Sequence, residues 1–386
     1  MAQVTEGAAV AAGLDTAALF RPLRVRGLAL PNRIVMSPMT RHRSPGGVPA
    51  PEVAAYYRRR AEGGTGLVIT EGTAIEHTVA VDDPDVPHMY GAAALAGWRE
   101  VVEQVHAAGG RIIPQLWHVG PLWGAMSGVD DGAVSMRPSG NWGHLGKTTY
   151  TADYLDWATR PGAAMTERDI EDVIAAYVAA ARNAVDVGFD GIALHGAHGY
   201  LLDSFLWAST NTRDDRWGGD LERRTAFPAA VVGAIRDAIG DDLPIVYRFS
   251  QHKQQDYGAR LAATPEELGV VLGALVDAGA DVLDASGRYF DRPAFEGSDL
   301  SLAGWAKKLT GATAMAVGGI GFPLSADEPT GPDNRDEVLR RLERDEFDLV
   351  GIGRMHLADP AVAMRARAGR PLAQFDRPVH ELGPLH

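Results

Sequence analysis

Three side chains that can exchange protons stand close together in the segment LHGAHGYLLDSF. They are His195, His198 and Tyr200, which are three and two residues apart. As neutral hydrogen-bond donors the two histidines could hold and polarise a carbonyl oxygen, with the tyrosine as a nearby proton donor. As metal ligands they would need partners such as His118 and Asp284, which would indicate a metal-dependent hydrolase. A structural role as capping or core histidines is the third interpretation, and the spacing does not choose among the three.

Two polar residues elsewhere in the chain are suited to a planar heteroaromatic ligand. The amide of Gln115 can donate and accept hydrogen bonds, and the fixed charge of Arg248 can stabilise an anion on such a ring. This pair fits the pyrimidine edge of a flavin. The structural alternative is an ion pair between Arg248 and Asp284. Aromatic residues that could line a planar substrate pocket, or simply belong to the core, are Trp117, Trp123, Tyr289 and Phe290.

Glycines and an arginine late in the chain are typical of a phosphate site. Gly318 and Gly319 follow one short apolar run, and Gly353 and Arg354 follow the next. Bare backbone amides with a guanidinium bind phosphate well, although glycine alone equally indicates a tight turn. The planar donors of Arg354 favour the phosphate.

The elements that must position these residues are short apolar runs, each followed by a helical pattern. Runs of this kind are typical of parallel strands buried on both faces. We expect eight strands, near residues 33–39, 67–72, 111–118, 191–196, 244–250, 281–286, 313–319 and 348–353. Eight strand–helix units predict an α/β fold, a (β/α)8 TIM barrel, whose functional groups gather at the carboxyl ends of the strands. No strand is followed by GxGxxG, so a doubly wound dinucleotide-binding sheet is disfavoured.

Capping residues and one long insertion complete this outline. Thr166 with Asp169 predicts a helix that ends at Gly188, and Thr264 and Pro265 begin another. Asp359 and Pro360 predict the start of the last helix. The segment 119–165 is rich in Gly, Ser, Pro and Trp and follows the third strand, so we expect a lid over the site.

Composition excludes several classes of function. The chain has no cysteine, which excludes disulfides, thiolate metal sites and a cysteine nucleophile. The formal net charge of -13 disfavours nucleic acid and anionic membranes as partners. No run approaches the length of a membrane span, so we expect a cytoplasmic protein. Lys253 raises a Schiff-base aldolase as an alternative, but it lies beyond the expected strand.

Six segments, in order from about Leu19 to about Asp376, resemble the old yellow enzyme family of FMN-dependent ene-reductases. They cover nearly the whole chain, and STNTRDDRWGGDLERR is the most specific. The others are LFRPLRVRGLALPNRIVMSPMTR, YYRRRAEGGTGLVITEG, IIPQLWHVG, GFDGIALHGAHGYLLDSFL and VGIGRMHLADP. The resemblance implies noncovalent FMN in a single barrel domain over residues 19–376, with the lid at 119–165. We expect residues 1–18 to be a flexible N-terminal segment and 377–386 a C-terminal tail.

Roles for individual residues follow from the resemblance. It implies that Gln115 and Arg248 hold the pyrimidine of FMN, and that His195 and His198 bind the substrate carbonyl while Tyr200 donates a proton. Residues implied to contact the flavin ring are Pro38, Met39, Thr40 and Gly72, and those implied to hold the phosphate are Gly318, Gly319, Gly353 and Arg354. We place Trp117, His118, Tyr289 and Phe290 at the substrate.

The implied reaction is reduction of the activated C=C bond of an α,β-unsaturated carbonyl compound by NAD(P)H, in a ping-pong sequence of two hydride transfers. The partner is then a small enone-type molecule. The alternatives are a desaturating or aromatising flavin oxidase on a cyclic substrate, a metal-dependent hydrolase, and a barrel that only binds a ligand. Thr40 stands where many bacterial members have cysteine, and the segment after the fifth strand, RFSQHKQQDYGARLAATPEE, departs from the best-studied reductases.

Overall fold

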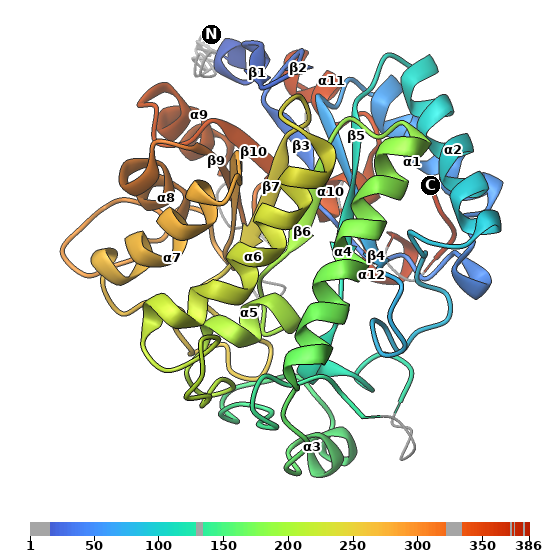
Figure 1. Cartoon of the computed structure of the whole chain (residues 1–386). Helices are drawn as coiled ribbons and strands as arrows, with labels where there is room; N and C mark the ends of the chain where they lie inside the picture. The colour runs from blue at the N-terminus through green and yellow to red at the C-terminus, as the bar shows by residue number, and fades with distance from the viewer. Residues whose placement is uncertain (1–15, 129–133, 322–333, 371–372, 374, 381–382) are drawn as a thin grey trace, which may run out of the picture.

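The expected barrel is present in the computed structural model. The structure describes residues 16–128, 134–321, 334–370, 373, 375–380 and 383–386. Parallel strands close in the order β10-β3-β4-β5-β6-β7-β8-β9, which confirms the (β/α)8 topology (Figure 1). The strands are β3 (Ile34–Met36), β4 (Leu67–Ala74), β5 (Ile112–Trp117), β6 (Ile192–His195), β7 (Ile245–Phe249), β8 (Val282–Ser286), β9 (Thr313–Val317) and β10 (Leu349–Ile352).

Helices surround the strands and cover their outer faces (Figure 1). The longer ones are α1 (Pro51–Glu62), α2 (Ala92–Ala107), α4 (Glu167–Val187), α6 (Leu221–Ile239), α7 (Pro265–Asp277), α8 (Leu302–Thr310) and α9 (Arg335–Glu343). The shorter ones are α3 (Ala152–Ala158), α5 (Leu201–Leu206), α10 (Arg354–Ala358), α11 (Val362–Arg367), α12 (Arg377–His380) and the 3-10 turns η1 (Thr16–Phe20), η2 (Pro45–Gly47) and η3 (Gly120–Leu122). In the described part of the chain no helix combines the length and apolar character that crossing a bilayer requires.

Two of the three expected helix starts have the expected caps. The side chain of Thr166 accepts a hydrogen bond from the Asp169 amide in a capping box, and α4 ends at a left-handed Gly188 with φ 105°. The side chain of Thr264 caps α7 by accepting from the Glu267 amide. The third expectation was wrong in detail: α11 begins at Val362, after a turn in which Asp359 accepts from the Ala361 amide at 2.8 Å.

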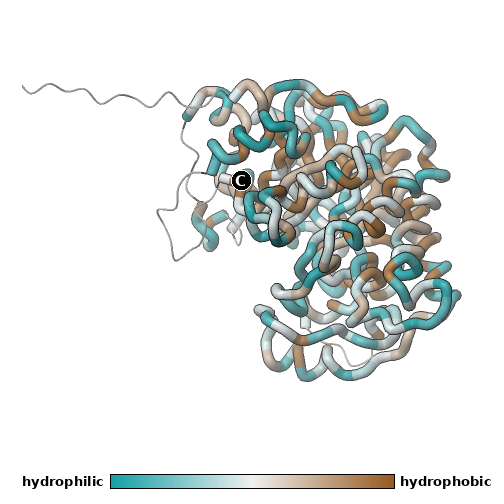
Figure 2. The backbone as a smooth tube through the Cα atoms, turned by 90° about the vertical axis from the view of Figure 1, so that its left-hand side faces the viewer, coloured by the Kyte–Doolittle hydropathy of each residue, from teal (hydrophilic) through white to brown (hydrophobic). Residues whose placement is uncertain are grey.

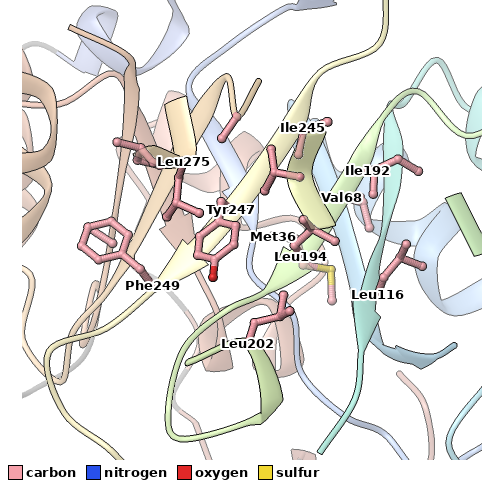
Figure 3. Packing of buried hydrophobic residues seen from close by; sticks show 14 of the residues in the cluster. Met36, Val68, Leu116, Ile192, Leu194, Leu202, Ile245, Tyr247, Phe249 and Leu275 are labelled. Atoms are coloured by element: carbon pink, nitrogen blue, oxygen red, sulfur yellow. The ribbon is translucent and has the colours of Figure 1, made fainter. Parts of the chain in front are cut away.

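Strand side chains divide the interior into an outer and an inner core because they alternate in direction along each strand. Ile192, Leu194, Tyr247 and other outward residues pack against the helices (Figure 3). The inward residues near the strand starts form a separate apolar cluster, in which Ala193 and Val246 take part. Figure 2 shows hydrophobic and hydrophilic stretches interspersed along the chain.

A hairpin that we did not predict closes the amino-terminal end of the barrel. β1 (Leu23–Val25) pairs antiparallel with β2 (Leu28–Leu30). Val25, Leu28 and Leu30 are buried and join the inner cluster at the strand starts. This end of the barrel is therefore filled with apolar side chains.

The segment after β5 holds more structure than a plain loop. Its described residues, 119–128 and 134–165, include η3 and the unpredicted helix α3. Trp142 and Tyr154 form a small cluster with Leu122, and Tyr200 packs against it. The function of this segment as a lid stays a prediction, as do the domain limits at residues 18 and 376. Residues 1–15 of the expected N-terminal segment lie outside the described residues.

Candidate active site

The alternation along the strands explains why polar residues meet inside the carboxyl end of the barrel. Gln115, His195, Arg248 and Asp284 each lie two residues beyond an inward apolar residue of the same strand, and therefore also point inward. Parallel pairing places His195 opposite Arg248, and Arg248 opposite Asp284. These strand positions thus give one polar layer above the apolar one.

A cavity of about 170 Å³ lies over this layer. It is lined by Pro38, Met39, Thr40, Gly72, Gln115, Trp117, His195, His198, Tyr200, Arg248 and Gln254. The structure therefore brings together ten residues that the sequence predicted, and adds Gln254. Gly72 is required by close packing, because a Cβ atom there would lie 2.3 Å from the Trp117 ring.

Several buried polar atoms in this layer have no hydrogen-bond partner among the described residues. They include Gln115 Nε2, Arg248 Nη2 and His195 Nδ1. Arg248 Nε does donate to Asp284 Oδ2 at 2.6 Å, so the ion pair suggested as a structural alternative exists, yet it leaves Nη2 available. An unpaired buried donor costs about 1–3 kcal/mol. The layer is therefore suited to a ligand whose polar edge completes these hydrogen bonds.

A second cavity of about 320 Å³ shares Pro38, Met39 and Arg248 with the first. Its far part is lined by Gly318, Gly319, Gly353 and Arg354, as expected, together with Gly287 and Arg288. Gly318 has φ 142°, and a Cβ atom there would lie 2.4 Å from the Gly287 carbonyl oxygen. The two cavities together fit an elongated ligand with a polar ring at one end and an anion at the other. FMN has this shape, and these residues fit it.

The two histidines of the motif are neutral. Burial, reinforced by the charge of Arg248, holds the pKa of His195 well below its usual range, and burial does the same for His198. His198 has a left-handed backbone with φ 65°, and its Nε2 lies 3.0 Å from Ser286 Oγ. The two rings are 5.1 Å apart at 82°. Both imidazoles can therefore act as uncharged hydrogen-bonding groups at the cavity.

Tyr200 completes the group at the residue that precedes α5. Its ring lies 4.6 Å from the His195 ring and 5.0 Å from the Trp117 ring, both edge to face. Its hydroxyl accepts a hydrogen bond from Gln254 Nε2 at 2.8 Å. Burial raises the pKa of the phenol above its ordinary value, so the hydroxyl keeps its proton at neutral pH.

Three predicted substrate residues lie elsewhere. His118 is fully buried with both ring nitrogens engaged: Nδ1 accepts from the Gly120 amide at 3.0 Å, and Nε2 lies 3.1 Å from His77 Nδ1. Phe290 packs in the main core against Phe347. Tyr289 lines neither cavity and lies beside Gly318 and Gly319. Within the described ranges, no three His, Cys, Asp or Glu side chains converge as a metal site would require.

Among the cavity residues that were not predicted from the sequence are Gln254 and Arg288. Gln254 lies in the segment after β7 that departs from the better-known reductases, and that departure was the available signal. Arg288 follows β8 by two residues and lines the glycine-rich cavity. Its position just past the end of a strand is the signal from which it could have been predicted as a site residue.

A (β/α)8 barrel with this pair of cavities is suited to a flavin-dependent oxidoreductase. The model of the NADH:flavin oxidoreductase / NADH oxidase family matches residues 18–373, and the chain belongs to that family, of which the old yellow enzymes are part. The flavin oxidoreductase hxnT of Emericella nidulans is 31% identical over 385 residues, covering 93% of this chain and 92% of that protein. The putative 12-oxophytodienoate reductase 11 of Oryza sativa subsp. japonica is 32% identical over 380 residues, covering 94% of each.

Solved structures agree with this membership. Morphinone reductase superposes with a TM-score of 0.76 at 29% identity, covering 93% of this chain and 91% of that one. Old Yellow Enzyme from Pichia sp. gives a TM-score of 0.77 at 27% identity, covering 93% and 89%. The protein is an FMN-dependent oxidoreductase that takes hydride from NAD(P)H and reduces C=C bonds of unsaturated compounds.

Proposed function

We propose that the cavity reduces a small α,β-unsaturated carbonyl compound, with His195 and His198 holding its carbonyl oxygen and Tyr200 protonating its α-carbon. The observation that supports this assignment is the convergence of two neutral imidazoles and one protonated phenol on a single cavity. The same cavity contains the unpaired donors of Gln115 and Arg248.

The cofactor roles form part of the proposal. Gln115 and Arg248 would hold the polar edge of the flavin, and Pro38, Met39, Thr40 and Gly72 would contact its ring. Gly318, Gly319, Gly353 and Arg354 would hold the phosphate. When bound, FMN supplies hydride transfer from NAD(P)H to the β-carbon of the alkene.

The substrate roles rest on electrostatics. Hydride addition at the β-carbon places negative charge on the carbonyl oxygen, where hydrogen bonds from His195 and His198 would stabilise it. A neutral imidazole can donate a hydrogen bond from its N–H group without changing its protonation state. Tyr200 would then deliver its proton to the α-carbon. Because burial keeps the Tyr200 phenol protonated at neutral pH, its proton is in place for donation.

We also propose a cytoplasmic location and a small enone-type molecule, rather than nucleic acid or a membrane, as the partner. NAD(P)H is an intracellular reductant, and the net charge of -13 repels nucleic acid. Cell fractionation and a nucleic-acid retention assay test these two statements.

The decisive experiment is the absorbance spectrum of the purified protein before and after anaerobic NADPH, followed by cyclic enones. A flavin band that bleaches with NADPH and returns with cyclohexenone supports the proposal. A band that returns with oxygen but with no enone overturns it and favours the oxidising alternative. Protein that stays colourless after FMN is added contradicts the cofactor assignment.

A further inference from the structure

We propose that Gln254 and Tyr150 are positioning residues that fix the direction of the Tyr200 proton. This inference rests on the proposed role of Tyr200 as proton donor. The three side chains come from three separate parts of the chain: the segment after β5, the loop after β7 and the start of α5. We refer to Tyr150, Gln254 and Tyr200 as the phenol–amide–phenol chain.

The geometry of the phenol–amide–phenol chain is continuous. The hydroxyl of Tyr150 donates to Gln254 Oε1 at 2.8 Å. Gln254 Nε2 in turn donates to the hydroxyl of Tyr200 at 2.8 Å. Gln254 and Tyr200 both line the cavity beside His195 and His198. One amide therefore joins a residue of the lid segment to the proton donor.

The chemistry of the amide gives the chain a direction. A carboxamide accepts only at oxygen and donates only from nitrogen. Because the Tyr150 proton occupies Oε1, the NH₂ group must face Tyr200, whose oxygen is then an acceptor. The Tyr200 proton is left to point into the cavity. With the amide reversed, Tyr200 would donate its proton to Oε1, and the NH₂ group would face the hydroxyl of Tyr150.

The backbone of Gln254 is tied to the motif that it serves. Its amide donates to the His198 carbonyl oxygen at 3.0 Å. The neighbouring Lys253 pairs at 2.6 Å with Asp203 of α5, and both of these side chains have 0% exposure. The other oxygen of Asp203 accepts from the Gly199 amide at 2.7 Å. Gln254 is therefore held in register with Tyr200.

Tyr150, by contrast, depends on how the lid segment docks. The backbone of this segment meets the loop after β7 through two hydrogen bonds, Tyr257 N to Lys147 O at 2.8 Å and Gly146 N to Gln255 O at 3.1 Å. If the segment moves away, Oε1 loses the proton that orients the amide. Docking of the lid segment thus makes Tyr200 competent to donate.

The substitution Gln254→Glu tests the direction of the chain. A carboxylate accepts from both phenols, so it would hold the Tyr200 proton away from the substrate. Below the pKa of the new carboxyl, its O–H restores one donor. We expect enone reduction to slow by about 10- to 100-fold at neutral pH and to recover on acidification, with a smaller effect on flavin reduction by NADPH.

The pH profile isolates position 254. The titratable groups around Tyr200 include Asp82, Tyr150, Tyr154, His195 and Tyr257, and they are the same in Gln254→Glu and in the wild type. Tyr150→Phe should slow enone reduction less than Gln254→Glu does. The Gln254 amide is then free to turn, but its NH₂ group can still donate to the Tyr200 hydroxyl. Tyr257→Phe is the matched control: it removes a different phenol contact between the lid segment and the loop after β7, to Thr149 Oγ1 at 3.1 Å, and keeps both side-chain hydrogen bonds of Gln254.

A measurement without turnover complements the kinetics. With 3-fluorotyrosine at position 200 of the holoenzyme, ¹⁹F NMR reports the pKa of that phenol. Gln254→Leu should raise the pKa of Tyr200, because the amide N–H stabilises the phenolate, whereas Tyr257→Phe should not raise it, because the charge of Tyr257 itself raises that pKa in the wild type. A Gln254→Glu profile parallel to wild type, or an unchanged phenol pKa in Gln254→Leu, overturns the inference. If Tyr200→Phe itself leaves enone reduction unchanged, the proposed function fails, and the inference fails with it.

Discussion

The same strands build two layers of side chains inside the barrel. The lower layer, near the strand starts, is apolar, and the upper layer, near the strand ends, is polar. The lower layer is apolar, is closed by the β1–β2 hairpin and leaves a cavity of about 10 Å³, against about 170 Å³ above the upper layer. Two residues along each strand, one period of the side-chain alternation, separate the two layers. The paired positions are Ile113 and Gln115, Ala193 and His195, Val246 and Arg248, and Val282 and Asp284.

This difference shows how one backbone serves two purposes. The lower layer fills its space with side chains and gains stability from their burial. The upper layer buries donors without partners, which is unfavourable until a ligand completes them. We therefore expect substitutions in the upper layer to affect chemistry and cofactor binding, and those in the lower layer to affect stability alone.

The largest effect should come from Tyr200→Phe. Loss of a general acid typically costs about 10²–10⁴ in rate. Because the ring packing against Trp117 and His195 is retained, the fold and the cofactor site should persist. Stopped-flow measurement of each half-reaction should show that alkene reduction slows far more than flavin reduction by NADPH. Equal slowing of both would contradict the role of Tyr200.

Arg248→Leu should weaken FMN binding and also destabilise the protein. Asp284 would be left buried with 1% exposure and no cation, and breaking such a pair costs about 3–5 kcal/mol. The double variant Arg248→Leu with Asp284→Leu separates the two roles. It should recover much of the stability, since apolar replacement of a buried pair is often tolerated, but not the FMN affinity. Recovery of both in urea unfolding and flavin titration would remove Arg248 from the cofactor site.

In the lower layer, Leu30→Ala should have the opposite pattern. Leu30 has 2% exposure, and truncating a buried leucine costs about 2–5 kcal/mol. FMN affinity and the turnover of folded protein should not change. Val134→Ala, at a side chain with 60% exposure, is the control and should stay within about 0.5 kcal/mol. A clear loss of FMN affinity in Leu30→Ala would break the separation of the two layers.

The same alternation explains which site residues could be predicted from the sequence. The apolar strand runs and the polar residues at their ends can be recognised in the sequence. Many of the cavity-lining residues between Pro38 and Arg354 could therefore be predicted. His118 lies outside the cavity because it follows Trp117 by one position, which points its side chain to the opposite face. Phe290 lies beyond the end of β8, where alternation no longer gives a direction.

Contacts between segments that are distant along the chain could not be predicted from the sequence. Tyr150 and Gln254 are separated by 104 positions, and their hydrogen bond depends on how the segment after β5 folds. Helix α3 within that segment is only seven residues long, too short for periodicity to stand out. The β1–β2 hairpin has three-residue strands and was missed for the same reason.

Glu71 gives the smallest predicted effect and tests how far the upper layer's polarity extends. It precedes the cavity residue Gly72, and its Oε2 accepts from the Arg41 amide at 2.7 Å while Oε1 has no partner among the described residues. Burial raises the pKa of this carboxyl from 4.5 to about 7. The neutral form is thus favoured in the folded state, so its contribution to stability is present below pH 4.5 and is lost as the pH rises through 7.

Glu71→Gln should remove this dependence from the holoenzyme. Between pH 4.5 and 7 the slope of unfolding free energy against pH should differ between variant and wild type by at most about 1.4 kcal/mol per pH unit. Buried histidines have the opposite effect. The pKa of His252 and of His356 is lowered to about 4, so each of them destabilises the folded protein as the pH falls from 6.5 towards 4. Only the difference between the two urea titrations isolates Glu71. Identical slopes would mean that this carboxyl is ionised in the folded protein, and that the upper layer tolerates an incompletely paired charge even outside the cavity.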